Sequence, residues 1–244
     1  MPTKAPGPAR RGAEVTKTKF LKATEQLFRR RGYEGTTIRD IARRAGVNLG
    51  TLQHYWGSKP AVFRDLFEQR FRSMRDAFLD RLQQIQRQAV EGTVLDATSV
   101  LAALVDASFR PGVAGTPTAR TSQRELFGRA LTDPSPVVIR EMNRLYEEPM
   151  LLFIDLLRRA CPRLPEAELD WRINCVIGVN LFSLVQGPRM RRYFGTGAQV
   201  PDAQVADWIL AFLVRGFEPT ATAPAMPATP VTRRAAPRSR PRRA

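Results

Sequence analysis

The side chains best suited to specific chemistry lie in one short stretch near the N-terminus, between Thr37 and Lys59. Amide, hydroxyl and imidazole groups follow one another closely within it. Such groups match the donors and acceptors on base edges in the major groove of DNA, where glutamine can bond adenine and threonine offers a hydroxyl or a methyl group. The candidates for base contact are Asn48, Leu49, Thr51, Gln53 and the single histidine, His54.

A helix-turn-helix would hold these candidates on one surface. Thr37 is a good N-cap for a short helix that turns two isoleucines inward, and Gly46 can supply the turn that ends it. Asn48 can then cap a second helix over 49–56. The second helix of such a motif lies in the major groove, with its N-terminal residues at the base edges. The alternative is two short structural helices that meet at a glycine by coincidence.

Further residues extend the pattern on both sides of this motif. They are Leu27-Phe28, Arg31-Gly32-Tyr33, Thr36 to Ala42, Ala45 to Asn48, Gly50-Thr51-Leu52 and Tyr55 to Lys59. In this run the chain resembles the DNA-binding domain of TetR/AcrR-family transcriptional regulators. The resemblance implies an all-helical homodimer on a palindromic operator in double-stranded DNA. It also implies repression as the usual outcome, and a C-terminal domain that binds a small-molecule effector of unknown identity.

The resemblance assigns roles to single residues as well. Thr37 and Lys59 would contact phosphates, and the helix from Asn48 to Tyr55 would contact bases. Gln53 departs from the family pattern, because many members have tyrosine at that position. Which of Gln53, His54 and Tyr55 touches phosphate therefore stays open.

Positive charge is concentrated at the two ends of the chain. The formal net charge is +16, and residues 1–60 hold 13 Lys and Arg against 4 Asp and Glu. Residues 61–216 are nearly balanced, whereas residues 217–244 carry six arginines and one glutamate. Such an excess indicates an acidic partner, either nucleic acid or an anionic membrane surface. It also leaves open an alternative function, a packaging protein that binds nucleic acid through its basic ends without sequence preference.

Helical periodicity runs through the rest of the chain, and no convincing strand pattern is present. The first helix is expected over 15–31, the fourth is long, and others are expected over 93–109, 119–132, 135–160, 166–186 and 202–216. The fold class is therefore all-α, with about nine helices. We expect a disordered basic arm (1–13), a three-helix helix-turn-helix domain (14–60), a helical ligand-binding and dimerisation domain (61–217) and a disordered tail rich in Arg, Pro and Ala (218–244).

The last two expected helices are the most apolar of the chain. Obligate interfaces resemble a divided protein core, and in the family this helix pair forms the dimer interface. The alternative is the ordinary core of a monomer. The candidate interface residues are Trp171, Ile177, Leu181, Leu184, Val205, Trp208, Ile209 and Phe212.

The effector site is expected among the middle helices, where polar residues interrupt apolar stretches. Aromatic and methionine side chains beside them supply enough apolar area for a drug-sized or acyl ligand. The same residue types at helical spacing also serve as plain core packing. The candidate ligand-contacting residues are Phe109, Met142, Asn143, Tyr146, Phe153, Trp171 and Asn174.

Other function classes lack the residues that they need. Two cysteines and one histidine cannot form the usual four-ligand zinc site, and so few cysteines indicate a reducing cytoplasm. The sequence contains no Gly-rich phosphate loop. We therefore expect no enzyme, no metal site and no cofactor. The longest apolar stretch, 173–185, is interrupted by polar residues and is too short to span a membrane.

Overall fold

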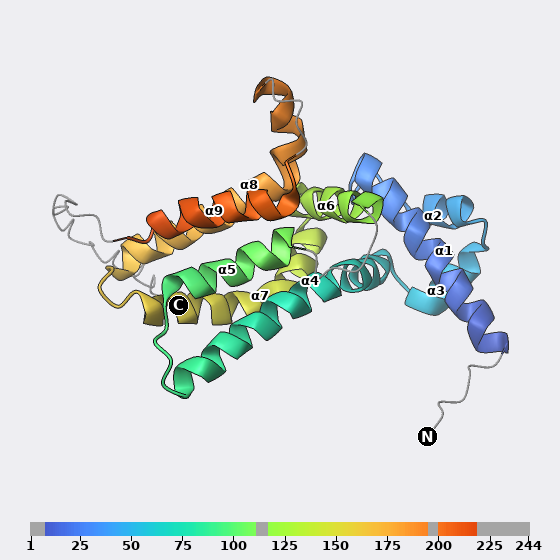
Figure 1. Cartoon of the computed structure of the whole chain (residues 1–244). Coiled ribbons are helices and arrows are strands. Elements are labelled where there is room, and N and C mark those ends of the chain that lie inside the picture. Colours follow the sequence, from blue (N-terminus) through green and yellow to red (C-terminus); the bar gives the residue numbers. More distant parts are fainter. Residues whose placement is uncertain (1–7, 111–116, 195–199, 219–244) are drawn as a thin grey trace, which may run out of the picture.

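The computed structural model describes residues 8–110, 117–194 and 200–218. These residues form nine helices and no strand, which confirms the all-α fold class. The stretches 1–7 and 219–244, where disorder is expected, lie outside the described residues. Figure 1 shows α1, α2 and α3 gathered at one end of the molecule, with the later helices forming the larger part.

The N-terminal end is built from three helices, α1 (Pro8–Arg31), α2 (Ile38–Ala45) and α3 (Leu49–Trp56). The first helix begins earlier than expected, so residues 8–13 are helical rather than disordered. Phe28 and Leu52 are fully buried in the core of this end. The Phe28 ring meets the Phe63 ring edge to face at a centroid distance of 5.2 Å, an arrangement that the charge distribution of aromatic rings favours.

The long helix α4 (Lys59–Val90) joins the two parts of the molecule. Ser58 caps it, its hydroxyl accepting the Ala61 N–H at 3.4 Å. Pro60 is tolerated because the N–H groups of the first helical turn have no acceptor within the helix. Buried side chains recur every three or four residues from Val62 to Ile85. One face of α4 therefore packs inward along most of its length.

The larger part continues with α5 (Ala97–Phe109), α6 (Pro117–Thr132), α7 (Pro136–Ala160), α8 (Glu166–Phe194) and α9 (Asp202–Arg215). The helix expected to end at residue 186 instead continues through Pro188 to Phe194. Its last turns change direction (Figure 1), as expected where proline removes a backbone donor and crowds the preceding turn. In the described part of the chain, no helix combines the length and apolarity needed to cross a membrane.

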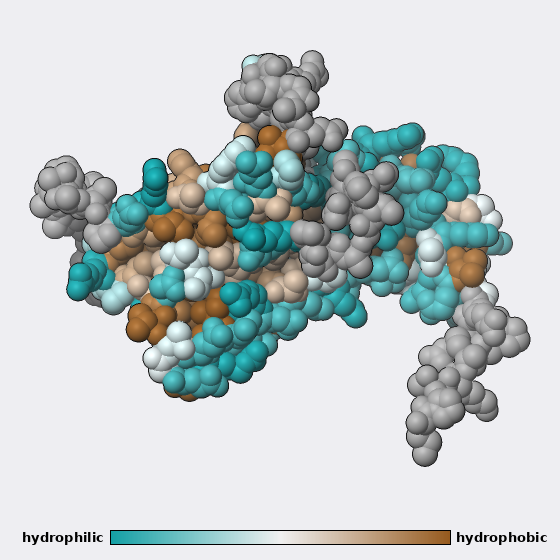
Figure 2. All heavy atoms as spheres, viewed as in Figure 1, coloured by the Kyte–Doolittle hydropathy of each residue, from teal (hydrophilic) through white to brown (hydrophobic). Residues whose placement is uncertain are grey.

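One outer face of α8 and α9 is unusually apolar. Trp171 is 71% exposed, Trp208 57% and Phe212 66%. Figure 2 shows hydrophobic residues gathered along α9. Exposed aromatic side chains that cluster in this way mark a surface that is suited to a partner.

Candidate nucleic-acid interface and internal cavity

Caps at each end fix the direction of the two short helices. Thr37 caps α2, its Oγ1 accepting the Asp40 N–H at 3.1 Å. Gly46 follows that helix with φ of +65°, a left-handed conformation that glycine adopts without steric cost. Asn48 then caps α3, its Oδ1 accepting the Gly50 N–H at 2.8 Å. The predicted helix-turn-helix is therefore present.

The helix α3 divides its side chains between the core and the outer surface. Leu52 is fully buried and anchors the helix. Of the predicted base-contacting residues, Asn48, Leu49, Gln53 and His54 are exposed, and Thr51 and Tyr55 are half-buried. This places hydrogen-bonding and apolar groups on the outside of a short helix that a major groove can admit.

Gln53 and His54 differ in how far their hydrogen-bonding groups are already used. Gln53 Nε2 donates to the carbonyl oxygen of Gly57 at 2.8 Å, beyond the C-terminus of α3. The His54 ring lies edge to face with the Tyr55 ring at 5.5 Å between centroids. Its imidazole forms no hydrogen bond with any residue that the structure describes. His54 can therefore take a new partner without breaking an internal bond, whereas one N–H of the Gln53 amide is already bonded to Gly57.

The two predicted phosphate-contacting residues, Thr37 and Lys59, both lie at the start of a helix. Helix N-termini attract anions because their first N–H groups are unpaired and the helix dipole is positive there. The Thr37 hydroxyl also donates to Asp40 Oδ2 at 2.8 Å, and this bond lowers the pKa of the Asp40 carboxyl. Lys59 Nζ lies 3.9 Å from the centre of the Tyr33 ring and 4.0 Å from the Glu34 carboxylate. Partial burial lowers the pKa of the Lys59 ammonium.

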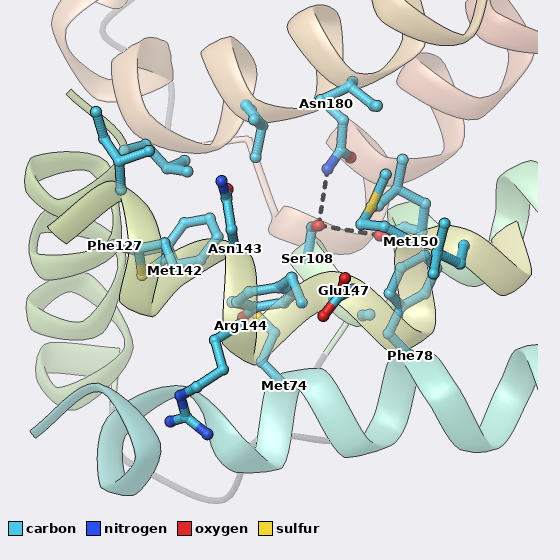
Figure 3. A pocket seen from close by; sticks show the side chains of 18 of the residues that line it. Met74, Phe78, Ser108, Phe127, Met142, Asn143, Arg144, Glu147, Met150 and Asn180 are labelled. Atoms are coloured by element: carbon cyan, nitrogen blue, oxygen red, sulfur yellow. Dashed lines mark hydrogen bonds between the residues drawn. The ribbon is translucent and has the colours of Figure 1, made fainter. Parts of the chain in front are cut away.

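A cavity of about 890 Å³ lies between α4, α5, α6, α7 and α8. Its volume falls in the range of small-molecule binding sites. Most of the lining is apolar and includes Met74, Met142 and Met150, whose flexible side chains can adapt to a ligand. Figure 3 shows these side chains converging from the surrounding helices.

Three of the seven predicted ligand-contacting residues, Met142, Asn143 and Tyr146, line this cavity. Two others belong elsewhere in the interior. Phe153 is fully buried in the core, its ring centre 5.7 Å from that of Phe78. Phe109 lines a second, much smaller cavity.

The remaining two predicted ligand residues, Trp171 and Asn174, are exposed on α8. The helix turns a different set of side chains inward, among them Ile177 and Asn180, which line the cavity. Residues three positions apart share a helix face only approximately. The pattern of polar and apolar residues in α8 therefore did not show which side of the helix faces the cavity.

Two further polar residues, Ser108 and Asn180, line the cavity; both are among the polar residues that interrupt apolar stretches, but neither is among the seven candidates. Asn180 is 1% exposed, and its Nδ2 donates to Ser108 Oγ at 2.9 Å. Ser108 Oγ in turn donates to the Leu104 carbonyl at 2.9 Å. Figure 3 shows Asn180 reaching from α8 toward Ser108 on α5. The available signal was the position of Asn180 inside the longest apolar stretch of the chain.

A buried carboxylate connects the cavity wall with the N-terminal helices. Asp133, in the turn between α6 and α7, accepts the Tyr33 N–H at 3.0 Å and the Ser135 N–H at 3.1 Å. It is 4% exposed and pairs with Arg129 at 3.4 Å. Residues close to it in the chain, Leu131 and Pro136, line the cavity. The turn between α6 and α7 therefore borders the cavity and also holds the loop between α1 and α2.

Glu141 forms a second connection, between α7 and α4. Its carboxylate accepts Arg64 Nε at 2.9 Å and Arg64 Nη2 at 3.0 Å, and it also accepts Arg144 Nε at 3.1 Å. The bonds from Arg64 and Arg144 hold the pKa of the Glu141 carboxyl below its ordinary value. Met142, the next residue, lines the cavity. A shift of α7 would therefore act on α4 close to Lys59.

Two sequence models of one protein family match the chain. The model described as "Bacterial regulatory proteins, tetR family" matches residues 20–66, and that described as "Tetracyclin repressor-like, C-terminal domain" matches residues 106–216. The chain belongs to the TetR family. The curated relatives of this TetR-family protein include the HTH-type transcriptional repressor KstR2 of Rhodococcus jostii, 34% identical over 98 residues, which are 40% of this chain and 44% of the relative.

A second curated relative is the HTH-type transcriptional regulator BetI of Escherichia coli, 33% identical over 104 residues, or 38% of this chain and 51% of the relative. The chain thus spans about half the length of the curated relatives it matches. A solved structure of the transcriptional regulator FadR from Bacillus subtilis, in complex with stearoyl-CoA, has the same fold. Its TM-score is 0.54 at 13% identity, covering 82% of this chain and 98% of that one.

The predicted interface residues of this TetR-family protein divide into two groups. Trp171, Trp208 and Phe212 are exposed, and Val205 is half-buried. Leu184 and Ile209 are buried within the chain itself, while Ile177 and Leu181 line the cavity. Phe182, which the sequence did not single out, is 57% exposed. It follows Trp171 by three helical turns, so both side chains lie on one face of α8.

Proposed function

We propose that this protein is a ligand-responsive transcriptional repressor that binds a palindromic operator as a homodimer. The observation that carries the proposal is the exposed outer face of α3, held by caps on both sides and by the buried Leu52. Hydrogen-bonding side chains on such a helix can contact base edges. The proposed role is not enzymatic, and it places the protein in the cytoplasm with the DNA.

The cavity supports the ligand-responsive part of this proposal. The structure of FadR from Bacillus subtilis, which has the same fold, supports it further because that protein holds stearoyl-CoA. A ligand changes operator affinity only if it binds the DNA-binding conformation and the alternative conformation with different affinities. The Asp133 and Glu141 contacts offer two routes by which a change in the cavity wall could reach the N-terminal helices. The first acts on the loop before α2, and the second on the start of α4.

Selection of bound genomic fragments tests the proposed function. We expect the full-length protein to enrich a few fragments that share a palindrome, with half-sites about 10 base pairs apart or a multiple of that distance. Affinity for such a fragment should exceed that for unrelated DNA by about a thousandfold or more. Binding without any preferred fragment, weakened equally by salt for every duplex, would instead favour the packaging alternative.

The proposed dimer predicts a clear effect of Trp208→Glu. A carboxylate at this position would be buried without a partner if α8 and α9 meet their copies, so we expect sedimentation to show a monomer at micromolar concentration. The monomer itself should unfold within about 0.5 kcal/mol of the wild type, because Trp208 is 57% exposed there. Val94→Glu is the control, since Val94 is 85% exposed and lies between α4 and α5. A Trp208→Glu protein that still sediments as a dimer would place the interface elsewhere.

A further inference from the structure

The buried wall of the cavity contains a hydrogen-bond acceptor that nothing in the described protein satisfies. Asn180 donates one of its two amide N–H groups to Ser108, and Ser108 donates its hydroxyl proton to the Leu104 carbonyl. Asn180 Oδ1 is left buried without a partner. A buried polar atom in this condition is costly, so a ligand group that bonds it would recover that cost.

Tyr146 presents a second unpaired polar group in the same cavity. Its hydroxyl is buried without a partner. Burial raises the pKa of the Tyr146 phenol, so the hydroxyl stays protonated at neutral pH and can donate to an oxygen atom. The buried part of the cavity therefore offers one neutral acceptor and one neutral donor.

The charged lining residues lie on the exposed side. Arg140, Arg144 and Glu147 are all exposed. Arg144 already binds Glu141 and lies 3.4 Å from Glu68 on α4, and Figure 3 shows its guanidinium extending toward that helix. A ligand carboxylate placed beside Asn180 would meet an acceptor oxygen and would lose its water without gaining a cation.

We infer that the effector is an apolar molecule whose buried end carries an uncharged hydrogen-bond donor, a hydroxyl or an amide N–H, that bonds Asn180 Oδ1. This inference rests on the proposed function, because it takes the cavity to be the effector site. Any charged group of the effector lies at the other end, beside Arg140 and Glu147. Alcohols are the simplest ligands of this class.

Three probes of matched length test this ligand class on the full-length protein. They are 1-dodecanol, dodecanoate and dodecyl methyl ether, each used to displace the fluorescent apolar compound N-phenyl-1-naphthylamine. We expect the alcohol to displace it at concentrations about tenfold below those of the ether and the carboxylate. A site that bonds a hydroxyl discriminates strongly against an analogue that lacks one.

Asn180→Leu removes the acceptor and keeps the volume nearly unchanged. We expect its preference for alcohol over ether to fall to about threefold or less. Gln88→Leu exchanges an amide for leucine at an exposed position of α4 outside the cavity lining and should keep the full preference. Ser108→Ala is a second variant, since the freed amide N–H of Asn180 should improve binding of the ether.

Equal displacement by all three compounds, or displacement by none, would overturn this ligand class. An unchanged preference in a folded Asn180→Leu protein would overturn the role of Asn180. These displacement assays use no DNA, so their outcome is separate from that of the proposed function. If the alcohol binds as expected but never alters operator affinity, the ligand class stands and the regulatory role fails.

Discussion

His54→Ala is expected to weaken operator binding by about 2 kcal/mol or more, roughly thirtyfold, while binding to unrelated DNA changes little. Each lost base contact costs about 1–3 kcal/mol, and a homodimer on a palindrome loses it twice. His54 is exposed on α3 and makes no internal hydrogen bond within the described chain. The measurement is a pair of titrations at one salt concentration, with the selected operator and with an unrelated duplex of equal length.

Gln53→Ala provides the comparison on the same helix. Its amide already donates to Gly57, so we expect a smaller fall in the ratio of operator affinity to unrelated affinity. Far-UV circular dichroism of both variants should match the wild type, since both side chains are exposed. An unchanged ratio for His54→Ala would show that another α3 residue, such as Leu49 or Thr51, carries the specificity.

The N-terminal helices could be predicted from the sequence because their signals are local. Thr37 and Asn48 cap the helices that they were expected to cap, and Gly46 has the left-handed conformation that ends α2. Leu52 is the one buried residue of α3, and the predicted base-contacting residues lie on the helix around it. The sequence could not show the bond from Gln53 to Gly57, because a hydrogen bond from a side chain to the backbone leaves no periodic pattern in the sequence.

The cavity was predicted only in part, because its position depends on how five helices pack. Methionine and aromatic residues have the same helical spacing in a filled core and around a cavity. Phe153 and Met142 therefore look alike in the sequence, although one is packed in the core and the other lines the cavity. The interface residues show the same limit, since Ile209 and Trp208 are neighbours of which one is buried in the chain and the other is exposed.

The sequence could not predict the long-range contacts of Asp133. Their removal should cause the largest loss of folding stability. We expect Asp133→Ala to lower the free energy of unfolding by about 2–5 kcal/mol, because two buried backbone N–H groups, those of Tyr33 and Ser135, lose their acceptor. Gly32 shows how closely this contact is packed, since a Cβ there would lie 2.7 Å from Asp133 Oδ2. Urea unfolding at a fixed protein concentration measures the loss.

Asp133→Asn separates stability from the position of the N-terminal helices. Its one remaining carbonyl oxygen can hold either the Tyr33 or the Ser135 N–H, so we expect a smaller loss of stability, together with weaker operator binding at a temperature where the variant stays folded. Tyr33 explains the second effect, because its ring lies 3.9 Å from Lys59 Nζ and a freed loop would no longer position that ammonium. Asp80→Ala, an exposed carboxylate on α4, should change stability by no more than about 0.5 kcal/mol. If Asp133→Asn binds the operator as tightly as the wild type, the turn between α6 and α7 stabilises the fold without positioning the DNA-contacting helices.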